Sequence, residues 1–355
     1  MRIRVAILDS DKVYLDRFVT AFSAKFADKI ELYSFTELQI ALDALVSNRI
    51  EIFLASETFE IDFSTIPPKC VFAYFVDGNG IESYNNQNAI GKFQRADLIY
   101  KQILSLYSES GNGSDLSGAS IDGENARIIM FSSPCGGVGT STVAAACAQY
   151  FSSKGNNVLY LNLEPFGSSD LYFSGDGQYD MSEVIYALKS RKTNLSMKLE
   201  SCVKKDASGV SFYSATSVPL DMLELTKDDI VRLIGALKLT GSYNYIVIDI
   251  DFGLAPENLN IFKLADYLVW VSDGENSSNK KIVRAFQALS LLEQNDKADL
   301  IRRLNLMYNR YSSKTGKNIE DIDAKLIGGI QVFVHNDEKQ VVDHISKMSM
   351  FDNIL

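Results

Sequence analysis

Short runs of apolar residues alternate with longer amphipathic stretches along the first hundred residues. Apolar runs occupy residues 5–8, 50–54 and 71–76, and stretches with helical periodicity occupy residues 15–26 and 38–46. A strand that is apolar at nearly every position needs cover on both faces, which is typical of a parallel sheet enclosed by helices. The pattern therefore predicts a doubly wound α/β domain.

The same rhythm returns after an interruption. Ser, Gly, Asn and Asp crowd residues 109–125, a composition that offers too little apolar surface to order itself and that predicts a flexible linker. We therefore expect two domains, residues 1–108 and residues 126–355. The second domain repeats the α/β pattern, and in such sheets ligands bind at the carboxyl ends of the strands. Its apolar runs include residues 128–131, 158–161, 245–249, 267–271 and 304–307.

Composition narrows the class of protein. The chain has 355 residues, of which 46% are hydrophobic and 23% charged, as in globular proteins. Its net charge is −10, from 45 acidic and 35 basic residues, which disfavours a nucleic-acid partner because the surfaces that bind nucleic acids are basic.

The 4 Cys and 2 His lack the spacing of a zinc site or a disulfide framework, so a reducing, cytoplasmic setting fits. No run approaches about 18 apolar residues, so no membrane-spanning segment is expected.

The most informative segment is a glycine-rich loop between a predicted strand and an apolar helix. Gly136, Gly137 and Gly139 permit positive φ and a close approach to an anion, and the following helix directs its first amides to the same point. Phosphate is the ligand that this arrangement favours. Ser141 and Thr142 stand where one hydroxyl can bind Mg²⁺ and the other a phosphate oxygen. A purely structural turn is the alternative.

The loop also resembles that of a known family. Residues 135–142 resemble the deviant Walker A loop of the MinD/ParA ATPases, with Cys135 and Thr140 in place of its two lysines. The resemblance implies ATP and Mg²⁺ as cofactors. It places eight residues in the nucleotide site: Cys135, Gly136, Gly137, Val138, Gly139, Thr140, Ser141 and Thr142.

Together with the α/β domain in front of it, this domain is similar to the TadZ/CpaE branch of pilus assembly proteins. The resemblance implies an α/β fold with two doubly wound domains. The N-terminal domain would be receiver-like, with a flavodoxin-like fold, and the C-terminal domain would be a P-loop MinD/ParA-like domain.

Further positions take their expected roles from the same resemblance. Asp249 ends an apolar run at the place of the family's Walker B aspartate, so Ser141 and Asp249 are the implied magnesium-site residues. Asn162 and Glu164 stand at the two acidic positions of switch I. Glu164 and Asp249 are weak candidates for a catalytic role. Ordinary turn and loop residues are the alternative interpretation.

A strand-end segment completes the expected site. Asn309 and Arg310 are similar to the residues that border adenine in the family, where Asn309 would bond the base edge and Arg310 would stack or contact phosphate. The alternative is that Asn309 forms a turn.

Loss of both lysines should weaken catalysis more than binding. Phosphoryl transfer needs the charge on the β- and γ-oxygens to be cancelled, and each lost donor costs roughly 3 kcal/mol, or about a hundredfold in rate. We expect an ATP-binding localisation or scaffold protein of a Tad-type pilus or related secretion machine, with weak or no hydrolysis. The alternative is an active MinD/ParA-type ATPase acting as a positioning switch. A dinucleotide oxidoreductase is disfavoured, because Thr142 stands where its fingerprint needs a third Gly or Ala.

The N-terminal domain resembles a response-regulator receiver without its phosphoacceptor. Asp9 and Asp11 form the acidic cluster after the first strand, and Lys92 stands at the late lysine position. Ala55 or Ser56 replaces the phosphoacceptor aspartate, so we expect no phosphorelay and instead a role in protein contacts or dimerisation. The implied partners are a second copy of the chain and pilus or secretion-machine proteins. These partners would recruit the cytoplasmic protein to the cell pole or inner membrane.

Overall fold

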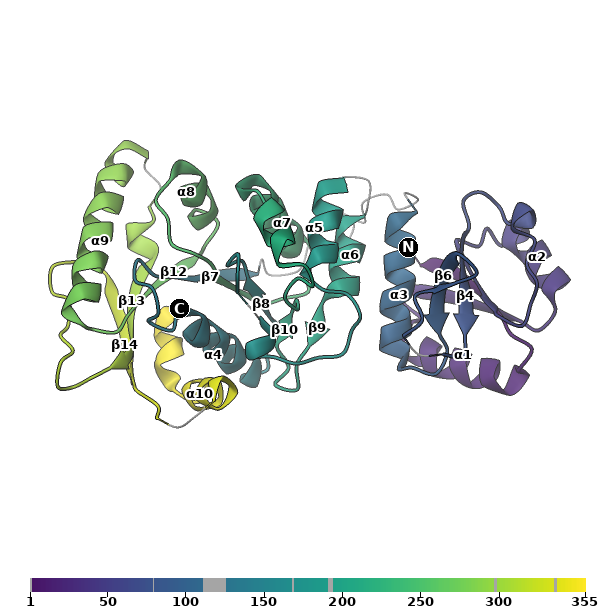
Figure 1. The fold of residues 1–355 in the computed structure, drawn as a ribbon, viewed down its shortest axis with the longest axis horizontal. Coiled ribbons are helices and arrows are strands. Elements are labelled where there is room, and N and C mark those ends of the chain that lie inside the picture. The colour runs from purple at the N-terminus through teal and green to yellow at the C-terminus, as the bar shows by residue number, and fades with distance from the viewer. Residues whose placement is uncertain are drawn as a thin grey trace. The chain divides into compact units, whose positions relative to one another are not determined.

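The computed structural model describes residues 2–78, 80–110, 126–167, 169–190, 194–296, 299–334 and 337–355 (Figure 1). The expected linker at 109–125 therefore lies, from residue 111 onward, outside the described residues. The chain divides into two compact units. The N-terminal unit also includes a segment from the second half of the sequence that ends at Ser201, and the C-terminal unit contains the rest. Within the described part of the chain, no helix combines the length and apolarity that a membrane span requires.

The N-terminal unit contains a six-stranded sheet with the strand order β2-β1-β3-β4-β6-β5. Neighbouring strands run parallel, except that β5 forms an antiparallel hairpin with β6. The order of the parallel strands is that of flavodoxin-like domains, which confirms the predicted fold class. The elements are β1 (Ile3–Leu8), α1 (Lys12–Phe26), β2 (Ile30–Phe35), α2 (Leu38–Ser47), β3 (Ile52–Ser56), β4 (Val71–Val76), β5 (Ser83–Tyr84), β6 (Gln87–Gly91) and α3 (Ala96–Glu109).

Each face of this sheet has its own hydrophobic core. Along β1, Val5 and Ile7 pack with residues of α1 and α3, whereas Ala6 and Leu8 pack with residues of α2. Successive side chains of a strand point to opposite faces, so an all-apolar strand is stable only between two helical layers. The uninterrupted apolar runs in the sequence are explained by this double cover.

A helix from the second half of the sequence, α6 (Leu195–Cys202), belongs to the N-terminal unit. Met197 joins the core on the face that carries α1 and α3. The buried amine of Lys198 lies 2.8 Å from Glu109 Oε1 and 2.9 Å from Ser105 Oγ. The N-terminal unit is thus completed by residues far from it in sequence, which the sequence pattern did not indicate.

The C-terminal unit contains an eight-stranded sheet with the order β14-β13-β12-β7-β11-β8-β10-β9. Neighbouring strands are parallel, except that β9 pairs antiparallel with β10. Helices α4 and α10 lie on one side of the sheet, and α7 and α8 on the other (Figure 1). The strands are β7 (Arg127–Ser132), β8 (Val158–Asn162), β9 (Lys204–Lys205), β10 (Ser211–Phe212), β11 (Tyr245–Asp249), β12 (Tyr267–Ser272), β13 (Leu304–Tyr311) and β14 (Lys325–Gln331). The helices are α4 (Thr140–Ser153), α5 (Met181–Ser190), α7 (Lys227–Leu239), α8 (Pro256–Phe262), α9 (Asn276–Asp296) and α10 (Glu338–Ile345).

Strand register brings polar residues together at the carboxyl ends of the central strands. Asp249, the last residue of β11, pairs in register with Phe131 of β7 and Asn162 of β8. The glycine-rich loop leaves the same edge of the sheet, because it connects the end of β7 to the start of α4. Ligands of parallel α/β sheets bind at this edge.

Candidate functional site

The glycine-rich loop runs from the end of β7 to Gly139, which is the N-cap of α4. Gly137 and Gly139 have φ of 76° and 80°, a conformation that favours glycine. Gly139 provides no side-chain cap, so the first amides of α4 are available to a ligand. A Cβ at Gly139 would lie 2.5 Å from Asn309 Nδ2, so any side chain would displace that contact. An uncapped helix N-terminus behind a concave backbone favours an anion such as phosphate.

Asn309 and Arg310 support this loop from the end of β13. Asn309 is buried, and its Nδ2 donates a hydrogen bond to the Val138 carbonyl at 2.8 Å. Arg310 donates from Nη1 to the Gly137 carbonyl at 3.0 Å. Both residues lie beside the loop, and their contacts brace its backbone. Their expected contacts with adenine and phosphate remain predictions.

Cys135 is directed into the protein at the position where the related loops carry a lysine. Its buried Sγ lies 3.4 Å from the Ser278 carbonyl of α9, and burial raises the pKa of the thiol. Its amide donates to Ser133 Oγ, whose hydroxyl donates in turn to the Val271 carbonyl. These contacts tie the first half of the loop to β12 and α9, so Cys135 has a packing role and brings no charge to the loop.

Two carboxylates lie beside the first turn of α4. Asp249 is fully buried, and Glu164 accepts a hydrogen bond from the Ser141 hydroxyl at 3.1 Å. Burial, as the largest cause, and the charge of Glu164 raise the pKa of Asp249 to about 8, although the nearby Ser141 hydroxyl acts in the opposite direction. Burial also raises the pKa of Glu164, and the charge of Asp251 adds to this effect. The site thus concentrates acidic groups that have little compensation.

One oxygen of Asp249 has two donors and the other has none. The Tyr160 hydroxyl and Asn162 Nδ2 each donate to Oδ2 at 3.0 Å. Oδ1 is buried and has no hydrogen-bond partner. A buried carboxylate oxygen without a hydrogen-bond partner raises the free energy of the folded state, so its position indicates that it binds a ligand.

A divalent cation fits this arrangement. The Ser141 hydroxyl and Asp249 Oδ1 are hard oxygen donors, which are the ligands that Mg²⁺ prefers. Among the described residues, no group of three His, Cys, Asp or Glu side chains could hold a metal by itself. Mg²⁺ commonly takes one or two protein ligands and completes its shell with water and substrate phosphates. Ser141 and Asp249 could therefore hold it together with a phosphate bound by the loop.

Two tyrosines of the site were not found from the sequence. Tyr160 is buried in β8 and donates a hydrogen bond to Asp249. Burial raises the pKa of Tyr172, and a hydrogen bond between its phenol and Thr142 acts in the opposite direction. The available signal was Tyr160 itself, a polar group within the apolar run 158–161, because a buried tyrosine hydroxyl usually has a partner.

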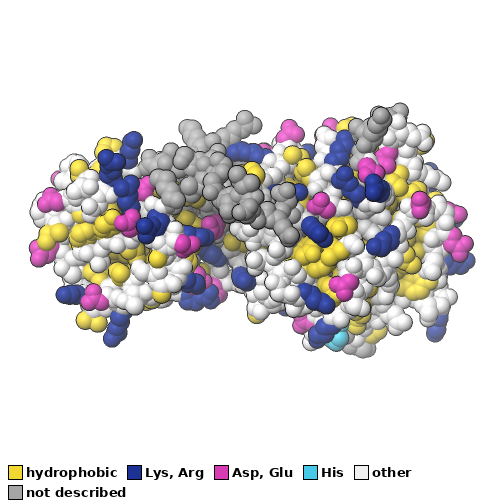
Figure 2. Space-filling view, turned by 180° about the vertical axis from the view of Figure 1, so that it is seen from behind, with side chains coloured by type: hydrophobic (Ala, Val, Ile, Leu, Met, Phe, Trp, Pro, Cys, Tyr) yellow, Lys and Arg dark blue, Asp and Glu magenta, His cyan; other side chains and the backbone are white. Residues whose placement is uncertain are grey.

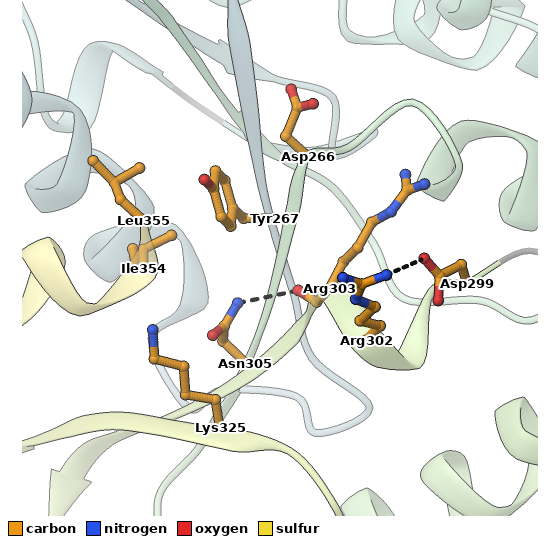
Figure 3. A pocket seen from close by; sticks show the side chains of 9 residues that line it. All are labelled: Asp266, Tyr267, Asp299, Arg302, Arg303, Asn305, Lys325, Ile354 and Leu355. Carbon is orange, nitrogen blue, oxygen red and sulfur yellow. Dashed lines mark hydrogen bonds and ion pairs between the residues drawn. The ribbon is translucent and has the colours of Figure 1, made fainter.

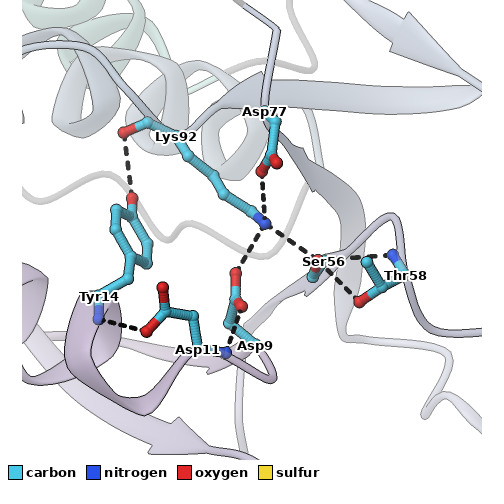
Figure 4. A network of polar contacts seen from close by, with 7 residues as sticks. All are labelled: Asp9, Asp11, Tyr14, Ser56, Thr58, Asp77 and Lys92. Carbon is cyan, nitrogen blue, oxygen red and sulfur yellow. Dashed lines mark hydrogen bonds and ion pairs between the residues drawn. The ribbon is translucent and has the colours of Figure 1, made fainter.

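The receiver-like unit has its own polar cluster (Figure 4). Lys92 Nζ lies 2.7 Å from Asp9, 2.9 Å from Asp77 and 3.0 Å from Ser56 Oγ. Burial opposes the charge of Lys92, but the two carboxylates outweigh it and raise its pKa above the ordinary value. Of the two residues considered from the sequence, Ser56 is the one that faces Lys92, whereas Ala55 packs in the core with α2. The charge of Lys92 is therefore balanced by Asp9 and Asp77, although β3 ends without an aspartate.

A pocket of about 360 Å³ lies at the other edge of the C-terminal sheet (Figure 3). Tyr267, Asn305 and Lys325 line it from the amino ends of β12, β13 and β14. Arg302 pairs with Asp299 at 3.9 Å beside it. Because this pocket lies at the amino ends of the strands, it is separate from the glycine-rich loop.

Comparisons with known proteins define the class of each unit. A ParA family ATPase from Chlorobium tepidum TLS has a similar structure, with a TM-score of 0.51, 20% identity, and coverage of 65% of this chain and 97% of that one. The septum site-determining protein MinD from Pyrococcus horikoshii OT3, complexed with Mg-ADP, gives a TM-score of 0.50, 18% identity, and coverage of 64% and 92%. The C-terminal unit therefore has the MinD/ParA-type P-loop fold, as predicted.

The N-terminal unit is assigned more specifically. Residues 1–108 match the family model of the TadZ-like receiver domain. The chain thus combines a TadZ-like receiver domain with a MinD/ParA-type fold, which confirms the resemblance found in the sequence. No curated protein sequence matches the chain.

Proposed function

We propose that this protein is an ATP-binding scaffold or localisation protein of a Tad-type pilus or a related secretion machine, and that it hydrolyses ATP slowly or not at all. The observation that carries the proposal is the unpartnered Oδ1 of Asp249 beside Ser141 and the uncapped start of α4. The TadZ-like receiver domain supports the pilus context. The homodimer and the recruitment to a pole or the inner membrane belong to this proposal.

In this proposal the chain binds the nucleotide through its backbone and holds the metal through two side chains. The amides of Gly136 to Thr142 bind the phosphates, and Ser141 and Asp249 hold Mg²⁺. Bound Mg²⁺ neutralises charge on the phosphate oxygens. Thr140 is neutral where the related loops have a lysine, so the loop itself supplies no cation to the transferred phosphoryl group, and slow turnover follows.

The second candidate is an active MinD/ParA-type ATPase that works as a positioning switch. Glu164 favours it, because a partly desolvated carboxylate with a raised pKa beside Ser141 could accept a proton from an attacking water. This alternative requires a measurable turnover.

Nucleotide content and turnover of the purified full-length protein test the proposal. We expect mass spectrometry to detect bound ATP or ADP, or titration to show Mg²⁺-dependent binding, with very slow phosphate release. Ser141→Ala should weaken the Mg²⁺-dependent binding, while Ser153→Ala, at the other end of α4, should not. Absence of nucleotide binding would contradict the proposal, and rapid turnover would establish the ATPase switch instead.

A further inference from the structure

The carboxylate of Asp249 is held by two side chains of the neighbouring strand. In the parallel pairing of β11 with β8, Asp249 lies opposite Asn162, and Val247 lies opposite Tyr160. Tyr160 and Asn162 are two positions apart and therefore share one face of β8. The Tyr160 hydroxyl and the Asn162 amide reach Asp249 from this face.

Both donors bind the same oxygen. Each lies 3.0 Å from Oδ2, so rotation of the carboxylate would break two hydrogen bonds inside the protein. Tyr160 is fully buried and its ring packs 5.2 Å from that of Phe173, centroid to centroid, which restricts its movement. The orientation that leaves Oδ1 unpartnered is thus fixed by the scaffold before any ligand arrives.

Asn162 also fixes the second acid. Its Oδ1 accepts a hydrogen bond from the Glu164 backbone amide at 3.0 Å, while its Nδ2 donates to Asp249. An acid at this position would put a third carboxyl group beside Asp249 and Glu164 and would lack the amide donor. The amide therefore suits a loop that has no lysine to offset these charges.

We propose that Tyr160 and Asn162 are positioning residues that direct Oδ1 of Asp249 toward the divalent cation beside Ser141, and so sustain Mg²⁺-dependent nucleotide binding without a loop lysine. This inference rests on the proposed nucleotide-binding function. Neither residue contacts nucleotide or metal directly in this scheme. Removing such supporting groups typically lowers metal affinity by about 10- to 100-fold.

The test separates metal-dependent binding from general damage to the fold. A fluorescent ATP analogue is titrated into the full-length protein with Mg²⁺ and, separately, with EDTA, and the ratio of the two affinities is the magnesium gain. Tyr160→Phe and Asn162→Ala should each reduce the magnesium gain by about 10-fold or more, with the EDTA affinity unchanged. Tyr150→Phe is the matched control, because it removes a buried tyrosine hydroxyl of the same unit that lies near Asp352 rather than Asp249.

Each outcome has a distinct meaning. An unchanged magnesium gain in both folded variants overturns this inference but leaves the proposed function standing. An equal loss of affinity with Mg²⁺ and with EDTA also overturns it, because that pattern marks a purely structural role. Absence of nucleotide binding by the wild-type protein overturns the proposed function and the inference with it. If Tyr160→Phe does not fold, Asn162→Ala decides the matter, because Asn162 is only partly buried.

Discussion

Cys135 and Thr140 occupy the two positions where the related loops carry lysine, and the structure gives them different surroundings. Cys135 is buried against the Ser278 carbonyl, so a lysine there would need a different side-chain path. Thr140 is the first residue of α4 and is partly exposed. A cation could therefore be restored at Thr140 with less disturbance than at Cys135.

Thr140→Lys should raise the rate of ATP hydrolysis. In the proposed complex, a lysine at the start of α4 would return positive charge to the place of the transferred phosphoryl group, and one such donor changes the rate by about 100-fold. Phosphate release at saturating ATP and Mg²⁺ measures the effect. Thr140→Met is the control, because it adds a long side chain without charge. Equal rates for the two variants would show that the missing cation does not limit turnover.

At the scale of single residues, the sequence predicted those features of the candidate site that depend on residues adjacent in the chain. The positive φ of Gly137 and Gly139 could be predicted because a phosphate loop uses consecutive residues, whereas the magnesium role of Ser141 stays a prediction. Tyr160 and Asp77 were missed because their contacts depend on strand register and on how a distant lysine reaches the sheet. No local pattern encodes such contacts.

Helix α7 shows how one side chain stabilises an element. Thr226 and Asp229 form a capping box at its start, and Lys189 of α5 lies 2.7 Å from the Asp229 carboxylate. Partial burial opposes ionisation of Asp229, but the hydrogen bonds from Lys189 and Thr226 outweigh it and lower its pKa below the ordinary 3.8. Such a carboxyl stabilises the fold above its unfolded-state pKa, and this contribution is lost as pH falls through its folded-state pKa.

Asp229→Asn should therefore destabilise the C-terminal unit by about 1 kcal/mol at neutral pH, because it removes a charge that pairs with Lys189 and lies in the first turn of α7. The difference from wild type should shrink once the pH falls below about 4. Urea unfolding followed by the fluorescence of Trp270, the single tryptophan, measures both effects. Asp228→Asn removes the same charge from the neighbouring exposed residue and should cost less. A pH-independent difference would contradict the assigned role of the Asp229 charge.

Docking of α6 on the N-terminal unit depends on a buried charge. Lys198 is fully buried and pairs with Glu109, which is partly exposed. Glu109→Ala should therefore loosen α6 more than Lys198→Met, because it removes a carboxylate from a buried amine that keeps its charge, whereas a methionine fills a similar volume without charge. Hydrogen exchange of the α6 amides, followed by mass spectrometry, measures the loosening. Equal exchange in the two variants would argue against this ion pair as the cause of docking.

The order of helices and strands along the chain was largely predictable from the sequence. Which elements pair or pack with one another was less predictable. Apolar runs marked the central strands of both sheets because those strands are covered on both faces. The β5–β6 hairpin was missed, although its loop residues Asn85 and Asn86, with φ of 47° and 59°, suit a type I′ turn. The placement of α6 was missed because amphipathicity shows that a helix has a buried face but not which surface covers it.

For the whole molecule, charge and apolar exposure constrain the partners. On the face seen in Figure 2, Lys and Arg side chains are interspersed with Asp and Glu and form no basic stripe. The net charge of −10 is the basis for expecting a protein partner rather than a nucleic acid, and this expectation stays a prediction. Phe166, two residues after Glu164, is 82% exposed and gives the edge of the candidate site an apolar group that a protein surface could cover.

We expect ATP with Mg²⁺ to shift the full-length protein from monomer to dimer in sedimentation velocity. Without ligand, Glu164 and the exposed Asp251 put negative charge at the carboxyl edge of the sheet, so two copies that approach through this edge repel each other. Bound metal offsets part of that charge and leaves Phe166 free to be buried.

Phe166→Ser should weaken the dimer. Leu239→Ser, at the last residue of α7, is the matched control, since Leu239 is 79% exposed and α7 ends near the opposite edge of the sheet. Sedimentation unchanged by ATP and Mg²⁺, in a protein shown to bind them, would rule out this nucleotide-dependent dimer.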